Sequence, residues 1–371
     1  MFHVVTMLIG LRSDGVPDSH LQAVSVDADQ GVFLRYRLFA DEDVLHLHTS
    51  TGPFSATTTS TDALVRFETN IASDGAWWTD NNGLELQQRQ RWARPFASGV
   101  NYSAEAGNEP VSINMYPVTA TAVLADTDAS KPALALITAN SHACTSMVDG
   151  EIELTLNRNV IRSGARFTGN RQVTQHTVLV VGRSSAATTT AARGAAAALS
   201  NPTLMFASAG VDANAPSGAP PFAPMSVAFP PEVAIVSLQL LPAGFNLSSL
   251  FRTVDQDRQP PLQHGGGDAG TMLLRVRHIH QLGVDDRTVT GPVTVNLASA
   301  LAPRWIVASA VEWTIDGSEA VAAAAAKRMH WPEAQDGVAV SPSPLSAESE
   351  DPPGTVTLQP MELKTFMLML A

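Results

Sequence analysis

The chain has 371 residues, of which 44% are hydrophobic, and this length suits two domains with ordinary cores. Its formal net charge of −12 argues against nucleic acid as a partner, because phosphate backbones are bound by clustered Lys and Arg. No apolar run reaches the roughly 20 residues of a membrane-spanning helix, so no membrane partner is expected. Residues 1–11 lack a basic segment and a small-residue cleavage site, so they predict a strand rather than a signal peptide.

Strand patterns dominate the first half of the chain. Residues 31–39 and 44–48 alternate in polarity around an acidic turn, and this predicts an antiparallel hairpin. Residues 76–79 and 84–92 predict a second hairpin, because the Asn-Gly dipeptide between them supplies the positive backbone angles of a tight turn.

Residues 147–160 have the clearest strand pattern. An Asp-Gly turn precedes strict alternation, in which Ile152, Leu154 and Leu156 share one face. The strand ends in a polar, cationic tip that contains Arg158. We expect this tip, at residues 157–159, to lie near any ligand that the protein binds.

The composition changes after the first half. Residues 188–199 are rich in Ala and Thr and predict a short helix, whereas residues 207–231 are dense in Ala, Pro, Gly and Ser. We therefore expect a large β-sandwich domain over residues 1–200, a linker or long loop over residues 201–231, and a C-terminal β-sandwich domain over residues 232–371.

The second domain again consists mostly of strand patterns. One clear helix is predicted over residues 318–329, with Ser318 as its N-cap. No repeat of fixed period occurs. The predicted fold class is therefore mainly β, with a large antiparallel β-sandwich followed by a smaller one.

Metal-ligating residues are sparse in the sequence. His46 with His48, and His278 with His280, are spaced to share a strand face and could hold zinc with a third ligand. Histidines that fill the polar face of a strand explain this spacing better, so no metal site is predicted. Cys144 is the only cysteine, which excludes an intrachain disulfide, and it is expected to be a small buried residue.

No catalytic motif stands out, and no catalytic residue is predicted. The glycine-rich run at residues 264–270 lacks the Lys-Ser/Thr of a phosphate loop and indicates a flexible turn. Trp77 and Trp78 could stack on a sugar ring, although a strand-borne indole usually belongs to the core.

Carboxylates are plentiful, as a glycosidase pair would require. Asp285 and Asp286 are expected to be exposed loop charges, and Glu151 and Glu153 to lie on a solvated strand face.

Two glycosylation sequons occur, at Asn101 and Asn246. Such triplets are frequent by chance, so they only favour a secretory route.

Six segments, in one order along the chain, match a known family pattern. They are Thr-Asp-Asn-Asn-Gly-Leu-Glu at residues 79–85, Met-Tyr-Pro-Val at 115–118, the strand at 147–160, Leu-Leu-Arg-Val at 273–276, Pro-Val-Thr-Val-Asn-Leu at 292–297, and Val-Thr-Leu-Gln-Pro-Met-Glu-Leu-Lys-Thr-Phe at 356–366. They resemble the C-terminal half of glycoside hydrolase family 38, the α-mannosidases, and the lysosomal type in particular. The first segment is similar to that family's Thr-Asp-Ser-Asn-Gly-Arg-Glu.

The resemblance implies a zinc-dependent, retaining hydrolase of terminal α-mannosides on glycoprotein oligosaccharides. In that family the zinc ligands and the nucleophile lie in an N-terminal domain, and this chain has no counterpart of its His-x-Asp-x-x-Trp motif. We therefore expect a C-terminal β-region that is inactive alone, without a cofactor of its own, and with zinc in the missing domain. The expected partners are that catalytic domain and mannosyl oligosaccharides, and the expected location is lysosomal or secretory. Linkage specificity and homo-oligomer formation stay open.

The resemblance also implies a role for Arg158. It takes the first place of an Arg-Arg pair that approaches the bound sugar in the family, whereas Asn159 takes the second. The simpler alternative is a surface cation at a strand end. For the whole chain, the main alternative is a stand-alone carbohydrate-binding or scaffold β-sandwich protein, and a weaker one is a metalloenzyme that uses the four paired histidines.

Overall fold

The structure is a computed structural model that describes residues 2–8, 21–27, 32–39, 42–53, 61–93, 113–162, 165–167, 171–201, 225, 227–241, 270–327 and 354–371. The chain divides into two compact units. Unit 1 contains residues 1–205 and 280–290, and unit 2 contains residues 206–279 and 291–371. Most of the expected linker lies outside the described residues, so the predicted domain limits stay a prediction.

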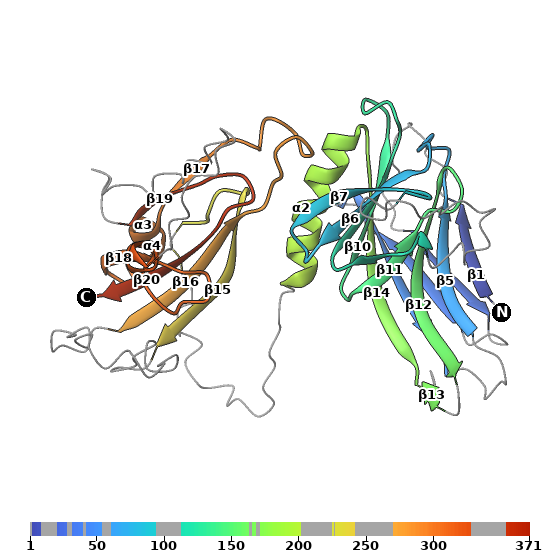
Figure 1. Ribbon diagram of the computed structural model, residues 1–371, viewed down its shortest axis with the longest axis horizontal. Coiled ribbons are helices and arrows are strands. Elements are labelled where there is room, and N and C mark those ends of the chain that lie inside the picture. Colours follow the sequence, from blue (N-terminus) through green and yellow to red (C-terminus); the bar gives the residue numbers. More distant parts are fainter. Residues whose placement is uncertain are drawn as a thin grey trace, which may run out of the picture. The chain divides into compact units, whose positions relative to one another are not determined.

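Unit 1 holds two β-sheets and a long helix (Figure 1). The eight-stranded sheet has the order β2 (Leu21–Asp27), β3 (Val32–Leu38), β4 (Val44–Thr51), β14 (Val173–Gly182), β10 (Ala133–Thr138), β9 (Thr121–Ala125), β6 (Ala76–Asn81) and β7 (Glu85–Gln90). The six-stranded sheet has the order β1 (Phe2–Leu8), β5 (Thr61–Glu68), β12 (Glu151–Arg162), β11 (His142–Thr145) and β8 (Tyr116–Val118), with β13 (Ala165–Phe167) paired to β12. Only β1 and β5 pair in parallel among these strands.

The two sheets of unit 1 pack face to face around one core, so the predicted β-sandwich is confirmed. The eight-stranded sheet contributes Leu34, Leu47 and Leu179, and the six-stranded sheet contributes Phe67 and Leu154, all at most 2% exposed. Alternate residues along each strand point into this core, as period-two patterning requires.

The strand predicted at residues 147–160 is β12, and its predicted inward face is correct. Ile152, Leu154 and Leu156 are buried in the core. The preceding turn needs glycine, because Gly150 has a φ of +77° and a Cβ there would lie 2.5 Å from the carbonyl oxygen of Thr69. The two backbones are close at this point, because the Thr69 N–H donates a hydrogen bond to the Gly150 carbonyl at 2.8 Å.

The other face of β12 differs from the expectation of a solvated surface. Glu153 is 5% exposed, because the guanidinium of Arg66 on β5 covers its carboxylate. Arg66 Nε donates to Glu153 Oε1 at 2.7 Å, and it lies 3.4 Å from Glu151 Oε2. The acidic pattern of this strand is therefore an ion-paired surface between two neighbouring strands.

Both predicted hairpins of unit 1 are present. β3 pairs antiparallel with β4, and β6 with β7 across a turn in which Asn82 and Gly83 have φ of 56° and 71°. Asp80, which is 2% exposed, anchors that turn. Its carboxylate accepts the N–H of Gly83 and the N–H groups of residues 119–121, the latter three at 2.9 Å each. The Asp-Asn-Asn-Gly segment is thus a structural anchor between two loops.

The helix predicted at residues 188–199 is confirmed as α2 (Ser185–Ser200). Ser184 caps it, because its side chain accepts the N–H of Ala187 at 3.2 Å. α2 packs on the outer face of the eight-stranded sheet, where Ala192 joins Ile137, Val178 and other apolar residues in a second core of unit 1. Within the described residues, no helix is long and apolar enough to cross a membrane.

Unit 2 is a smaller β-sandwich. Its four-stranded sheet has the order β15 (Val233–Leu241), β16 (Thr271–His278), β20 (Leu363–Leu370) and β18 (Val307–Trp313), and its two-stranded sheet pairs β17 (Val293–Asn296) with β19 (Thr355–Leu358). Inward residues of both sheets and of the short helix α3 (Leu297–Leu301) form one core, which includes Leu274, Leu358 and Leu368. The predicted mainly β fold is therefore confirmed in both units.

The helix predicted at residues 318–329 is shorter than expected. α4 spans Val321–Ala326, and Ala320 at its N-cap makes no side-chain cap. Ser318 does not cap it, because its hydroxyl donates to Asp316 at 2.9 Å within a preceding turn. The sequons at Asn101 and Asn246 and residues 264–269 of the glycine-rich run lie outside the described residues.

Candidate functional site

Arg158, the residue expected to bind sugar, lies on β12 opposite Asp62 of β5. Its side chain is 67% exposed, and Nε is 2.8 Å from Asp62 Oδ1. An exposed ion pair of this kind contributes about 0–1 kcal/mol, so it leaves the guanidinium free to exchange partners. Its role in sugar binding stays a prediction.

The predicted histidine pairs do not meet in one site. His46 and His48 on β4 join His176 of β14, which pairs opposite His48. The ring of His176 stacks on that of His48 with centroids 4.2 Å apart, and its Nε2 lies 3.0 Å from His46 Nδ1. Glu42 Oε2 holds the other nitrogen of His46 at 2.6 Å. Stacked rings present faces rather than lone pairs to one another, which is unsuitable for shared metal ligation.

The second pair is divided between the two units. His278 is buried at the end of β16, with Nε2 3.0 Å from the Gly291 carbonyl. His280 begins the segment 280–290 of unit 1, with Nδ1 3.5 Å from Asp285 Oδ2. In the described ranges, no three His, Cys, Asp or Glu side chains form a group that could hold a metal ion.

Two of the stacked imidazoles, His176 and His48, have a lowered pKa. Burial, together with the neighbouring His48 and His46, lowers the pKa of His176 to about 4. Burial and the charge of Arg37 likewise lower the pKa of His48. At neutral pH these stacked rings are therefore uncharged.

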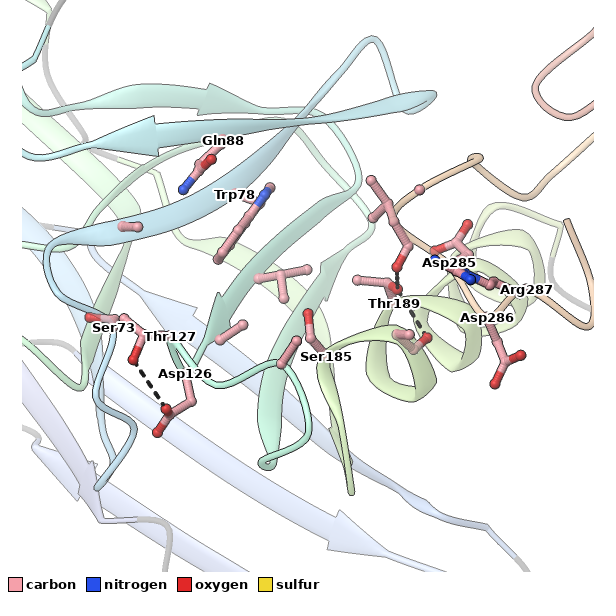
Figure 2. Close-up of a pocket in the computed structure, with 17 residues that line it drawn as sticks. Ser73, Trp78, Gln88, Asp126, Thr127, Ser185, Thr189, Asp285, Asp286 and Arg287 are labelled. Carbon is pink, nitrogen blue, oxygen red and sulfur yellow. Dashed lines mark hydrogen bonds between the residues drawn. The ribbon is translucent and has the colours of Figure 1, made fainter.

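A hollow that gathers polar groups around an aromatic ring lies entirely in unit 1 (Figure 2). It has a volume of about 750 Å³ and lies beside the outer face of the eight-stranded sheet. Trp78 and Gln88 come from the paired strands β6 and β7, and Val123 and Ala125 from β9. The start of α2, the turn at residues 126–129 and the segment 283–287 complete its walls.

The two neighbouring tryptophans point to opposite faces of β6. Trp77 is fully buried between the two sheets, as expected of a core residue. Trp78 is half-buried: it packs against the apolar cluster under α2, and it also lines the pocket. Alternation along the strand thus separates a core indole from one that is available to a ligand.

A buried polar clamp holds the segment 280–290 against unit 1. Arg193 of α2 donates from Nε to Asp285 Oδ2 at 3.2 Å and from Nη2 to Gln281 Oε1 at 2.9 Å, and Nη1 donates to the Leu84 carbonyl. The Gln281 amide also pairs with the backbone of Leu86, accepting at 2.8 Å and donating at 3.2 Å. Because β7 is the last strand of its sheet, Gln281 satisfies part of an open edge.

Asp285 is the centre of this clamp, so the expectation of exposed loop charge is wrong for it. Its side chain has no exposed surface. Burial alone would raise the pKa of Asp285, but the nearby His280, the charge of Arg193 and the N–H of Gln281 together lower it. Asp285 is consequently a buried, paired anion.

Two pocket-lining residues carry buried polar atoms that make no hydrogen bond within the described part of the chain. They are Ser73 Oγ and Asp285 Oδ1. The nearby hydroxyl of Thr189 contributes to lowering the pKa of Asp285. Buried polar atoms of folded proteins are usually satisfied, if necessary by water or a ligand. The pocket therefore has hydrogen-bonding capacity to offer.

The sequence pattern singled out Trp78, Asp285 and Asp286, although the two aspartates were expected to be exposed loop charges, and it gave no sign of the rest of the pocket. Residues 280–290 follow β16 in the chain, and their return to unit 1 has no periodic signature. The available signal was Arg193, a lone cation in an alanine-rich helix, since such a residue needs a partner when its helix packs on a sheet.

Comparisons with known proteins show that the chain is similar in sequence to α-mannosidases. It is 28% identical to the human epididymis-specific α-mannosidase over 83% of this chain and 29% of that protein, and 26% identical to the bovine lysosomal α-mannosidase over 89% and 30%. A solved protein of glycosyl hydrolase family 38 from Enterococcus faecalis covers 91% of this chain and 29% of its own, at 10% identity and a TM-score of 0.49.

No family model matches the sequence. The chain spans about 30% of the length of the curated relatives it matches. The resemblance seen in the ordered motifs is nevertheless confirmed by the sequence relatives: the chain is related to α-mannosidases.

Proposed function

We propose that this chain is the C-terminal β-region of an α-mannosidase, which hydrolyses terminal α-mannosides of glycoprotein oligosaccharides only together with a catalytic portion. One observation carries the proposal. The alignment with the lysosomal relatives extends over 89–90% of this chain but only 30–31% of the length of those proteins. Most of each relative thus lies outside the aligned part, and we assign the reacting groups to it.

The resemblance implies zinc, and the residues described do not fit that ion. His46, His48 and His176 stack on one another, and His278 and His280 serve separate local contacts. The proposal therefore assigns zinc to the catalytic portion, and derives no chemical step from this chain.

The matched motifs that the structure describes have structural roles, which supports a scaffolding function. Asp80 binds four backbone N–H groups of two loops, and Gly150 starts the central strand where no side chain fits. Groups of this kind set the positions of strands and loops. A rigid β-region could therefore present Arg158 to sugar bound by the catalytic portion.

The proposed partners are that catalytic portion and mannosyl oligosaccharides. The proposed location is the lysosome or the secretory route, which the lysosomal relatives and the sequons at Asn101 and Asn246 favour.

Complementation tests this function. The chain is co-expressed with the catalytic portion of a related α-mannosidase, and the purified mixture is assayed for release of mannose from an α-mannoside. We expect the two polypeptides to co-purify, and hydrolysis to require both. Equal hydrolysis by the catalytic portion with and without this chain, in samples where both are folded, would contradict the proposal. The matched control is the variant Gly150→Val, which removes the turn that starts β12.

A further inference from the structure

The pocket beside Trp78 has the composition of a small-molecule site. Its volume of about 750 Å³ falls within the about 300–1,000 Å³ of typical ligand pockets. Part of its lining is apolar, from Ala76, Val123 and Ala125, and polar side chains surround this floor. An apolar floor with a few polar groups is the usual arrangement for binding and orienting a small molecule.

Trp78 gives the pocket a flat aromatic surface. One part of the indole packs on the apolar cluster under α2, so the ring is held in place. Figure 2 shows Trp78 and Gln88 extending from adjacent strands on the side that faces α2. The apolar face of a pyranose ring packs well on an indole, and its hydroxyls then point outward to polar groups.

The charges around the pocket select against an anion. Asp126, Asp285 and Asp286 line it, against Arg287 alone among the lining cations of the described residues. Backbone N–H groups lower the pKa of Asp126, chiefly that of Asp128, and the pKa of Asp286, chiefly that of Thr288. These carboxylates are therefore ionised acceptors at neutral pH, and a phosphate or another acid would be repelled.

Ionised carboxylates do suit a ligand rich in hydroxyl donors. Both hydrogen bonds that Asp286 accepts from Thr288 go to Oδ1, at 2.8 and 2.9 Å, and Oδ2 accepts none from the described residues. The exposed amide of Gln88 and the guanidinium of Arg287 can in turn donate to ligand oxygens. A neutral sugar supplies both donors and acceptors at short spacing.

The walls are fixed before a ligand arrives. Arg193, Asp285 and Gln281 lock the segment 283–287 onto unit 1, and Ser185 N–H holds the turn at Ala129 by donating to its carbonyl at 3.1 Å. A preformed site loses little conformational freedom on binding, which strengthens an otherwise weak sugar interaction.

We propose that this pocket of unit 1 binds one pyranose ring of a neutral oligosaccharide, stacked on Trp78 and hydrogen-bonded by Gln88, Asp286 and Arg287. The neutral-sugar class rests on the lining alone. Only the choice of mannose as the first probe rests on the proposed function, so a chain without any role in mannoside hydrolysis would still be expected to bind sugar here.

Binding is measured on the full chain by saturation-transfer NMR and calorimetry, with methyl α-mannoside, methyl α-glucoside and methyl α-galactoside as probes. We expect saturable binding of at least one of them. Trp78→Leu keeps an apolar side chain but removes the aromatic face, and should weaken binding about tenfold or more, whereas Trp78→Phe should retain part of it. Gln87→Ala is the control, because Gln87 lies on the neighbouring strand β7, next to the pocket-lining Gln88, but does not itself line the pocket.

A second variant tests the pocket without changing Trp78, in case Trp78→Leu does not fold. Ala129→Trp places a bulky ring at the exposed rim, and should block binding without disturbing the core. Circular dichroism and thermal unfolding check that each variant is folded. The proposal is overturned if none of the three sugars binds saturably, or if folded Trp78→Leu and Ala129→Trp both bind like the unaltered chain.

Discussion

Replacing Arg193 with Met removes the cation of the buried clamp and keeps an apolar stem of similar length. The Arg193 side chain is 8% exposed and that of Asp285 is fully buried, so water screens their attraction little. Removing one partner of a buried ion pair costs about 3–5 kcal/mol, because the other charge is left without compensation. The Leu84 carbonyl and Gln281 Oε1 lose donors as well. We expect unit 1 to lose about 3–5 kcal/mol in free energy of unfolding at neutral pH.

The stability lost in the Arg193→Met variant should depend on pH and on whether Asp285 is still present. Without Arg193, one of the influences that lower the pKa of Asp285 is lost, so that pKa rises and the loss of stability should shrink as falling pH protonates the carboxylate. The double variant Arg193→Met/Asp285→Leu should recover part of the stability, since neither charge is then buried alone.

Hydrogen exchange measured by mass spectrometry in increasing denaturant follows the unfolding of α2 separately from that of unit 2. Lys131→Met is the control: Lys131 is 56% exposed and 3.7 Å from Asp126, so its loss should cost about 0–1 kcal/mol. If Arg193→Met cost no more than Lys131→Met, or if the double variant were less stable than Arg193→Met, the clamp would not hold this segment as described.

Three further changes follow from the same structure. Gly150→Ala should cost about 1–3 kcal/mol by thermal unfolding, because alanine is strained at a φ of +77°; a change below about 0.5 kcal/mol would contradict this. Stability should fall as pH drops from about 6.5 to about 4, since the lowered pKa of His176 and of His48 means that the unfolded chain binds more protons there. Allowing for solvent exposure, His176 should account for about 1 kcal/mol, and His176→Gln should flatten the urea-measured profile, whereas an unchanged slope would refute the assignment. Arg158→Ala should change stability by less than about 1 kcal/mol, because its pair with Asp62 is exposed, but should raise KM of the complemented α-mannosidase; unchanged kinetics would make it a surface residue.

Period-two alternation is the reason that much of the fold could be predicted from the sequence. Ile152, Leu154 and Leu156 alternate on β12 and are buried, and the Asn82-Gly83 turn has the backbone angles that its residue types favour. Both signals are local, because they depend on a strand's own two faces or on a turn's own angles.

Long-range partners could not be predicted in this way. His176 lies 130 positions from His46, and Asp285 lies 92 positions from Arg193. The sequence around each of these residues therefore does not identify its partner. Asp285 was expected to be exposed because two adjacent aspartates usually lie on a surface. Only the return of residues 280–290 to unit 1 makes it a buried partner of Arg193.

We have proposed that this chain is part of an α-mannosidase whose reacting groups lie in another portion. The most direct test is hydrolysis of a chromogenic α-mannoside by the purified, folded chain alone, with zinc added. We predict no release of chromophore above the rate without protein, and no further gain from zinc. Turnover close to that of an intact α-mannosidase, retained after repeated purification, would contradict the claim.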